Sequence, residues 1–329
     1  MKTLCRYDQS CLTKAPLCAS SVWRMRVGLG CIFGYFRPSV SVVWHIIWKR
    51  FLAWRLTCSV MRIVTLLSDF GYLDQYVSEM KGTILSLCPS ATVVDISHGI
   101  EKFNIRMGAF VLAAASTYFP VGTVHVAVVD PGVGGERRNL LIETQRAVYV
   151  GPDNGILLPA ALRDGIKETY SIENRQFMRS SVSSTFHGRD VFAYAAGRVA
   201  CGAELSEVGP KVSDPVSITR TRAEVSHERI DCEVLGIDSF GNIVTTASDK
   251  ELRAIGLQVR DRIVMKTKGR THHLSVGRTY SDTAEDKPVL LVGSHDFLEI
   301  AINKGNAARR FHLRPGDQLT FRRRSDYRS

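Results

Sequence analysis

The stretch VAVVDPGVGGERR, residues 126–138, places a carboxylate and a guanidinium where they could act together. Its apolar first part predicts a buried strand that ends at Asp130, and a turn rich in Pro and Gly then leads to Arg137. A carboxylate held at a strand end can accept a proton or bind hydroxyl groups, whereas a guanidinium can only donate hydrogen bonds and offset negative charge. The stretch therefore predicts part of a site for proton transfer or for binding a polar ligand.

Two more polar residues, Asp69 and His98, follow predicted strands in the same way. The carboxyl ends of parallel strands meet at one edge of a sheet, so we expect these side chains near Asp130. At such an edge a carboxylate such as Asp69 suits the paired hydroxyls of a ribose, as in dinucleotide-binding folds. The GxGxxG fingerprint of those folds is absent, since GVGGE does not match it, and an NAD site of that kind is not expected.

Two helix starts carry further candidates. Asp74 opens the predicted helix 74–88, either as a capping acid that opposes the helix dipole or as a ligand contact. His187, in TFHGRDVFA, precedes the helix within residues 186–202, where the positive helix end favours a neutral imidazole that could accept a proton. Capping or packing is the alternative role of His187, and Arg189 with Asp190 is expected to form a structural pair.

These residues leave different functions open. In a metal-dependent phosphoesterase, one or two hard cations would be held by convergent ligands, namely Asp69, Asp74, Asp130, Asp153 and His187. In a nucleoside-processing enzyme, the carboxylates would instead bind the nucleoside while Asp130, Arg137 and His187 act on a water. A module that binds a nucleoside without turnover is a third possibility. A methyltransferase is not favoured, because no Gly-rich loop of the ExGxGxG type follows the first strand.

The order of elements predicts two different folds in one chain. Strands 62–67, 92–97 and 123–130 alternate with helices 74–88 and 105–119, which indicates a Rossmann-like α/β layer with parallel strands. The character changes after Gly209 and Pro210. The short alternating strands that follow predict a smaller all-β antiparallel barrel or sandwich, and they are expected at residues 232–238, 242–248, 262–268, 271–277, 288–294, 297–303 and 318–324.

Charge and composition divide the chain further. Residues 1–60 hold nine Lys or Arg against one Asp, which leaves 34 Lys or Arg against 31 Asp or Glu, a net +3, in the rest. We expect translation to start at Met61 and residues 1–60 to be a dispensable extension, with a functional basic arm as the alternative. The expected units are then an α/β domain (61–210), a linker (211–227) and a β-barrel domain (228–329).

Partners and location follow from the same composition. A nearly neutral body lacks the basic surface that a nucleic acid requires, and no apolar run is long enough to span a bilayer. Beyond residue 60 the cysteines Cys88, Cys201 and Cys232 are widely spaced and odd in number. They imply neither a disulfide framework nor a metal motif, which fits a reducing cytoplasm.

Taken together, the motifs SDFGxxDxYVxxMKG, DISHGI, VDPGVGGERR, GPDNG, TFHGRDVFA, IDSFGN and LEIAINKGNAA resemble the S-adenosyl-L-methionine hydroxide adenosyltransferase family, which is related to fluorinases and chlorinases. The resemblance runs from Met61 to about Arg324. It implies an α/β domain joined to an antiparallel β-barrel, in a homotrimer whose active sites lie between subunits. The implied reaction converts S-adenosylmethionine and water to adenosine and methionine, with no metal or cofactor.

The resemblance also implies residue roles. The catalytic set of the family falls on Asp130, Arg137 and His187, with the proton acceptor left open between Asp130 and His187. The implied substrate contacts are Asp69 for the ribose hydroxyls, Asp74 and Asp238 for the methionine ammonium, Ser294 for its carboxylate, Phe240, Asn242 and Phe297 for the adenine, and Phe103 in place of a pocket Trp of fluorinases.

Two departures from the fluorinase pattern favour water over halide as the nucleophile. Asp130 stands where fluorinases have a Tyr, and Gly188 stands where they have a Ser, so a halide-binding hydroxyl is missing. A third departure, His295 in place of an Arg, affects the expected contact with the methionine carboxylate.

Overall fold

The computed structural model describes residues 62–218 and 223–323. The predicted extension, residues 1–60, and the predicted start at Met61 lie outside the described residues. Within the described ranges, no helix is long and apolar enough to cross a membrane.

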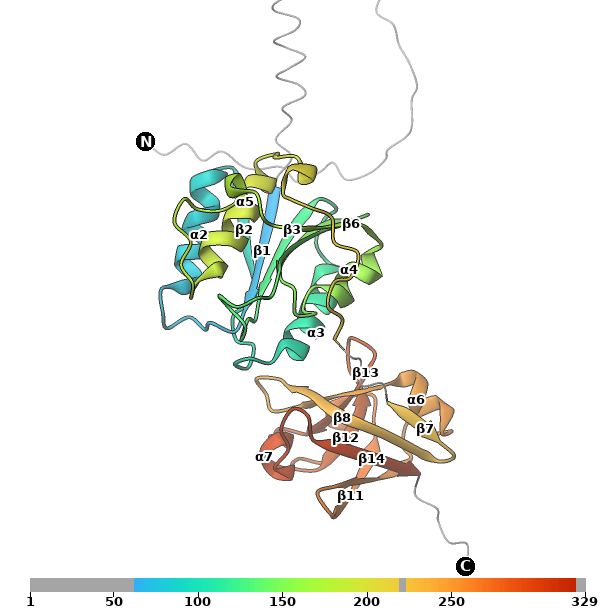
Figure 1. Cartoon of the computed structure of the whole chain (residues 1–329). Coiled ribbons are helices and arrows are strands. Elements are labelled where there is room, and N and C mark those ends of the chain that lie inside the picture. The colour runs from blue at the N-terminus through green and yellow to red at the C-terminus, as the bar shows by residue number, and fades with distance from the viewer. Residues whose placement is uncertain (1–61, 219–222, 324–329) are drawn as a thin grey trace, which may run out of the picture. The chain divides into compact units, whose positions relative to one another are not determined.

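The first sheet is mixed and has the strand order β2, β1, β3, β5, β4, β6 (Figure 1). Its strands are β1 (Arg62–Ser68), β2 (Ala91–Ser97), β3 (Thr123–Val128), β4 (Asn139–Thr144), β5 (Ala147–Pro152) and β6 (Ile166–Ser171). The first three strands pair in parallel, as predicted. The later strands were not predicted: β5 is parallel to β3, and β4 is antiparallel to both β5 and β6. The sheet is therefore mixed, because the two-residue connection from β4 to β5 can form only a hairpin.

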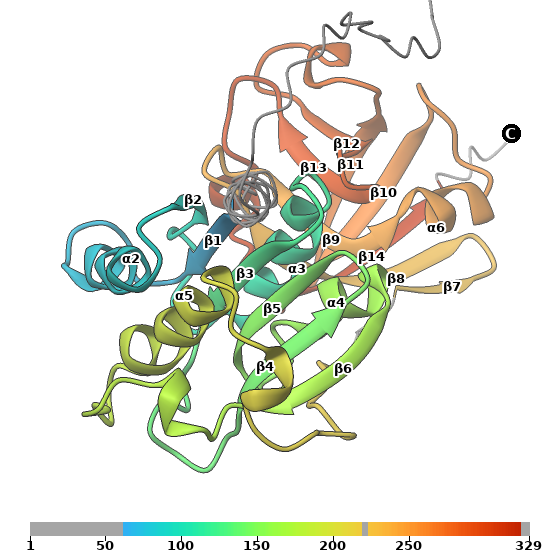
Figure 2. The ribbon, with the colours of Figure 1, turned by 90° about the horizontal axis from the view of Figure 1, so that it is seen from above.

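Helices cover both faces of this sheet (Figure 2). On one face α2 (Tyr76–Leu87) packs against α5 (Tyr194–Ala200), which continues a π-helix over Gly188–Ala193. On the other face α3 (Ile105–Ser116) packs against α4 (Leu158–Asp164). Each pair shares a buried apolar cluster with the strands, so the strand ends, and the candidate residues on them, are held by a core on both sides.

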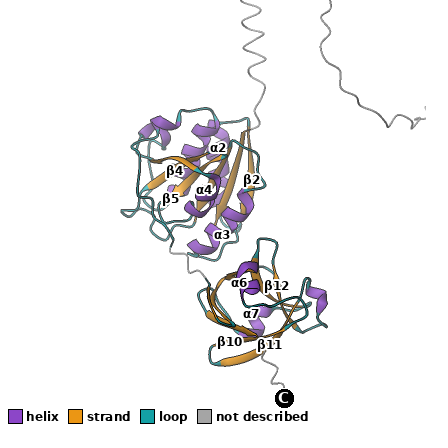
Figure 3. Ribbon diagram, turned by 90° about the vertical axis from the view of Figure 1, so that its right-hand side faces the viewer, coloured by secondary structure: helices purple, strands orange, loops and turns teal. Residues whose placement is uncertain are grey.

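The second sheet closes into a barrel. Its strands are β7 (Glu224–Ser226), β8 (Arg229–Ile237), β9 (Ile243–Ser248), β10 (Arg262–Thr267), β11 (Arg270–Val276), β12 (Pro288–Val292), β13 (Phe297–Ile302) and β14 (Gln318–Arg323). Because β14 pairs with both β10 and β8, the strands from β8 to β14 form a ring (Figure 3), and β7 adds to the outside of β8. Two short helices, α6 (Asp249–Ala254) and α7 (Ala307–Phe311), complete the unit.

The strands of the ring confirm the predicted β-rich second half, and one pairing differs from the prediction. All the others are antiparallel, but β11 and β12 run parallel. Residues 277–287 return the chain to the same end of the barrel, which a hairpin cannot do, and parallel pairing follows. β7 lies inside the segment 211–227 that was predicted to be a linker.

A buried histidine in the first sheet gives a prediction about acid stability. His125 on β3 is 1% exposed and bonds Thr65 on β1 through Nδ1, 2.7 Å from Oγ1. Burial lowers the pKa of His125 from 6.5 to about 4. Below pH 6.5 the unfolded protein therefore binds a proton at His125 that the folded protein does not. The free energy of unfolding consequently decreases as the pH is lowered.

We expect the titration of His125 to lower the free energy of unfolding by about 3 kcal/mol as the pH falls from 6.5 to 4. Urea denaturation at both pH values should give a smaller pH dependence for His125→Gln than for the wild type. His273→Gln, which changes an exposed histidine on β11, is the control and should follow the wild type. An equal loss in wild type and His125→Gln would contradict the assignment.

Candidate active site

Asp130 and Arg137 form a short ion pair just past the end of β3. Arg137 Nε lies 3.1 Å from both carboxylate oxygens of Asp130, and Nη2 lies 2.5 Å from Oδ2. The two side chains are 5% and 11% exposed, so water screens the pair little. The predicted pairing of carboxylate and guanidinium across the Pro-Gly turn is therefore present in the structure.

The same guanidinium contacts His187. Arg137 Nη2 lies 2.9 Å from His187 Nδ1. A guanidinium has no acceptor, so Nδ1 must accept this hydrogen bond, and the neutral ring then carries its proton on Nε2. Burial, and next the positive charge of Arg137, lower the pKa of His187, which favours this neutral form. One arginine thus fixes the position of a carboxylate and the tautomer of an imidazole.

The residues that hold this group were only partly visible in the sequence. Arg137 Nη1 also donates to Asn139 Oδ1 at the start of β4, a contact that the sequence analysis missed. The sequence carried no specific signal for this contact. The turn itself approaches the chain before His187 closely: a Cβ on Gly134, at φ +76°, would lie 2.2 Å from the carbonyl oxygen of Ser184.

The neighbouring arginine has a different partner. Arg138 pairs with Asp153 of the GPDNG turn at 2.6 Å, and Asp153 also accepts the backbone N–H of Val216 at 2.7 Å. In the same turn Asn154 Oδ1 accepts from Ile156 N. These contacts give the turn a structural role, and Asp153 is engaged by Arg138 rather than by the group around Asp130.

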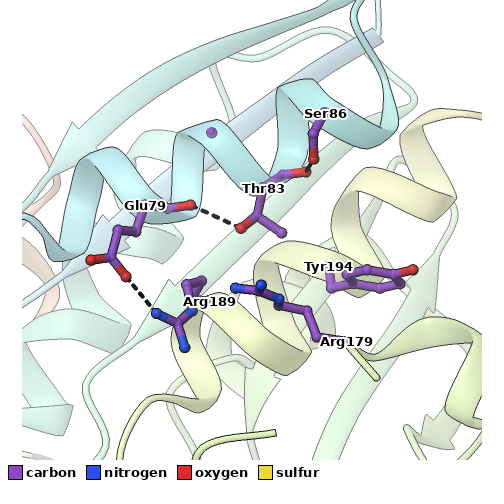
Figure 4. Close-up of a pocket in the computed structure, with 7 residues that line it drawn as sticks. Glu79, Thr83, Ser86, Arg179, Arg189 and Tyr194 are labelled. Atoms are coloured by element: carbon purple, nitrogen blue, oxygen red, sulfur yellow. Dashed lines mark hydrogen bonds and ion pairs between the residues drawn. The ribbon is translucent and has the colours of Figure 1, made fainter. Parts of the chain in front are cut away.

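The helix that follows His187 carries a network of charged side chains. Asp190, fully buried in the π-helix, accepts from Arg189 Nε at 2.7 Å, which confirms the predicted pair. Arg189 also donates to Glu79 on α2 at 2.7 Å, and with Arg179 these residues line a cavity of about 410 Å³ (Figure 4). π-helices are rare and occur frequently at functional sites. Here the network ties the helix that begins after His187 to α2.

A second cavity, of about 430 Å³, reaches the His187 side chain. Its wall includes Asn139 and Val191, so it borders the group formed by Arg137 and its partners. His187 is the N-cap of the π-helix but makes no side-chain capping hydrogen bond. The capping alternative from the sequence is therefore wrong, and the ring is used by Arg137 instead.

Asp69 lies at the end of β1 and is 6% exposed. Its Oδ2 accepts the backbone N–H of Phe103 at 3.0 Å, and its carbonyl oxygen accepts from Lys102 Nζ. Phe103 has φ +66°, an unusual conformation for a residue with a side chain, and its ring is 67% exposed. Asp74 is exposed and precedes Gln75, the N-cap of α2, so it does not cap that helix.

The remaining predicted residues lie on the barrel. Asp238 Oδ1 accepts from the backbone of Phe240 (2.9 Å) and Asn242 (2.8 Å), and Oδ2 accepts from Asn242 Nδ2 (2.9 Å). These three residues therefore form one preorganised turn between β8 and β9. Ser294 is exposed in the turn before β13, as is His295, and Phe297 begins β13 half-buried.

The metal-dependent alternative required carboxylates to converge with His187. Among the described residues, no group of three or more His, Cys, Asp or Glu side chains could hold a metal ion. Asp130 and His187 instead share the cation of Arg137, and Asp153 faces Arg138. The geometry thus does not favour a metal-dependent phosphoesterase.

The described residues thus form a layered α/β domain with acidic groups at its strand ends and a β-barrel domain with a polar turn. Residues 64–209 match the model of the SAM hydroxide adenosyltransferase N-terminal domain, and residues 232–320 match that of the C-terminal domain. The chain belongs to the SAM hydroxide adenosyltransferase family.

Individual relatives support this membership. An (R)-S-adenosyl-L-methionine hydrolase of Salinispora tropica is 36% identical over 260 residues, which cover 78% of this chain and 96% of the relative. A fluorinase of Actinoplanes sp. is 26% identical over 288 residues, covering 78% and 96%. A crystal structure of an uncharacterized conserved protein from Thermotoga maritima matches with a TM-score of 0.75 and 32% identity, over 79% of this chain and 100% of that one.

Proposed function

We propose that this protein hydrolyses S-adenosyl-L-methionine to adenosine and L-methionine by attack of water on C5′ of the ribose. The observation that carries the proposal is Arg137, which holds Asp130 at 2.5 Å and His187 at 2.9 Å in a family whose relatives include an S-adenosylmethionine hydrolase. The lower identity to the fluorinase, together with Asp130 and Gly188 in place of its Tyr and Ser, favours water as the nucleophile.

The hydrogen bonds divide the work on the water between two residues. With Nδ1 occupied by Arg137, neutral His187 offers only the Nε2 proton, so it orients the water as a donor. Asp130 keeps free lone pairs beside its bonds to Arg137 and is the proton acceptor. As the water oxygen bonds C5′, the C5′–S bond breaks, its electrons neutralise the sulfonium as the thioether of methionine, and the water proton passes to Asp130.

Arg137 has a positional role in this scheme. The sulfonium is already a good leaving group, so the enzyme mainly needs to align the water with the C5′–S bond. Arg137 fixes both groups that contact this water and offsets the negative charge that develops as it is deprotonated. The cavity at His187 offers water a path to the ring.

The substrate contacts complete the proposal. Asp69, held by the Phe103 backbone, binds the ribose hydroxyls, and Phe103 lines the pocket. Asp74 and Asp238 bind the methionine ammonium. The other contacts are Ser294 with the methionine carboxylate and Phe240, Asn242 and Phe297 around the adenine.

We propose a homotrimer with each active site between two subunits, built from the α/β domain (61–210) of one chain and the barrel domain (228–329) of the next. Large apolar side chains beside the proposed contacts are exposed, namely Tyr72 (65%), Leu73 (101%), Phe103 (67%) and Phe240 (77%). Large apolar side chains exposed in this way beside polar contacts are typically covered by a ligand or a partner. A second copy of the chain would cover them. We further propose a cytoplasmic enzyme that needs no metal or cofactor.

A product assay tests the proposed function. The full-length protein is incubated with S-adenosylmethionine, a chelator and no added halide, and adenosine and methionine are quantified by mass spectrometry. Equal amounts of both products would support hydrolysis. Substrate binding without any product would favour the non-catalytic module, and activity that stops with the chelator would favour a metal enzyme.

The tautomer of His187 predicts a pH dependence. Protonation of Nδ1 would break the hydrogen bond from Arg137, so kcat/KM should fall on the acid side, with a midpoint below the ordinary histidine pKa of 6.5. His187→Gln keeps a donor near the Nε2 position but cannot titrate. Its activity should be lower, and the acid limb assigned to His187 should be gone from its pH profile. An unchanged acid limb in this variant would refute the assignment.

A further inference from the structure

A row of polar side chains begins at Ser68, the residue before Asp69, and continues through His98 to Asp95. Ser68, the last residue of β1, is 0% exposed, and its Oγ lies 2.6 Å from Nδ1 of His98, which is 1% exposed. On its other side, His98 Nε2 lies 3.2 Å from Asp95 Oδ1. Within the described residues neither of these two buried atoms has a hydrogen-bond partner, so their contact with each other is what offsets the burial of both.

The protons in this row have one consistent arrangement. The Asp95 carboxylate can only accept, which places the proton of a neutral His98 ring on Nε2, so Nδ1 accepts from Ser68 Oγ, and that oxygen in turn accepts the backbone N–H of Phe70 at 3.2 Å. Burial lowers the pKa of His98, in agreement with a neutral ring.

Ser, His and Asp are also the residue types of a nucleophilic triad, but the geometry excludes that use. Ser68 is fully buried and its oxygen is already engaged by Phe70 N, so no substrate can reach it. A nucleophile must be exposed to the bond that it attacks. The role of Ser68, His98 and Asp95 is therefore to support the loop that follows β1.

Those neighbours form the loop that carries the proposed substrate contacts. Asp95 Oδ2 accepts from Tyr72 at 3.1 Å and from Lys81 on α2 at 2.7 Å. The carbonyl oxygen of His98 accepts from Gly71 N at 2.8 Å. Two residues of the segment from Asp69 to Asp74 are thus tied to this group, Gly71 to His98 and Tyr72 to Asp95.

We propose that His98 is a positioning residue that holds the Asp69 carboxylate in place for the ribose hydroxyls. The proposal rests on the proposed function, because it takes Asp69 as the ribose contact. Without the His98 ring, the contacts that it makes with Ser68 Oγ and Asp95 Oδ1 are lost, and the loop from Asp69 onward gains freedom. The expected effect falls on recognition of the ribose and not on the attack at C5′.

A comparison of two substrates tests this. kcat and KM are measured for S-adenosylmethionine and its 2′-deoxy analogue with wild type, Ser68→Ala, His98→Gln and the reference Asp69→Asn. In the wild type, loss of a hydroxyl bonded to a carboxylate should lower kcat/KM about 10- to 100-fold. In Ser68→Ala and His98→Gln, the ratio of kcat/KM between the two substrates should shrink towards that of Asp69→Asn. The change should come mainly from a higher KM for S-adenosylmethionine, with kcat within about threefold of wild type.

His125→Gln is the matched control, since His125 is also a buried histidine bonded through Nδ1 to a hydroxyl of β1. Its discrimination should equal that of the wild type even if its thermal stability falls as far as that of His98→Gln. Full discrimination in His98→Gln and Ser68→Ala would overturn the positioning role. A wild type that does not discriminate would overturn the ribose role of Asp69, and a wild type without turnover would overturn the proposed function itself.

Discussion

Asp130→Asn is expected to lower kcat by on the order of 10³-fold while KM changes little. The amide has nearly the shape of the carboxylate, but it cannot accept the water proton and no longer pairs with the charge of Arg137. In the wild type, Arg137 bonds both Asp130, at 2.5 Å, and His187, at 2.9 Å. Loss of the bond to Asp130 would therefore also leave Arg137 less able to hold His187. Steady-state kinetics on purified protein measure the effect.

Asp153→Asn is the matched control for this variant. Asp153 is a buried carboxylate paired with Arg138, the residue next to Arg137, and it lies in a turn beside the same sheet. Its loss should lower the thermal midpoint but leave kcat within roughly threefold of wild type, because it does not touch the water. Equal losses of kcat in both variants would mean that Asp130 acts only through folding.

Mixed oligomers are expected to recover activity that each parent variant lacks. Asp130→Asn disables the α/β half of a site, and Asp238→Asn removes the charge proposed for the methionine ammonium while its turn can still form. If each site joins the α/β domain of one subunit to the barrel of the next, every mixed trimer has one of its three sites free of both changes. Two differently tagged chains, co-expressed and purified through both tags, provide the sample.

The outcome separates two architectures. Recovery towards a third of the wild-type kcat/KM, with both homo-oligomers at or below a hundredth, supports a site shared between chains. In a site built within one chain, every mixed site would carry one of the two changes. Activity no higher than the mean of the parents, or failure of the two tags to purify together, would then refute the shared site.

Much of the fold was predictable because local patterns and tertiary pairing agree. The strands β1, β2 and β3 are short apolar runs bounded by polar turns, and each forms where the pattern indicated. The reversal of β4 was not predictable from such runs, since an apolar run does not specify its direction. The parallel pair β11 and β12 was missed for the same reason, because the route of residues 277–287 is decided by the whole barrel.

In the candidate site, too, some residues were predictable from the sequence and others were not. Asp130 and Arg137 were visible because a rigid turn places them seven residues apart in one segment. Asn139 and the tautomer of His187 were not, because both depend on where one guanidinium lies in space. The sequence left open which residue takes the proton, and the direction of a single hydrogen bond, from Arg137 to Nδ1, supports the proposed choice of Asp130.

The most direct test of the account follows the oxygen atom. Full-length protein turns over S-adenosylmethionine in ¹⁸O-water with a chelator present, and the products are analysed by mass spectrometry. We predict adenosine with one ¹⁸O, in its 5′-hydroxyl, together with unlabelled methionine, and loss of both products in Asp130→Asn. Adenosine without the label, or turnover only after a metal or halide is added, would contradict attack by water at C5′.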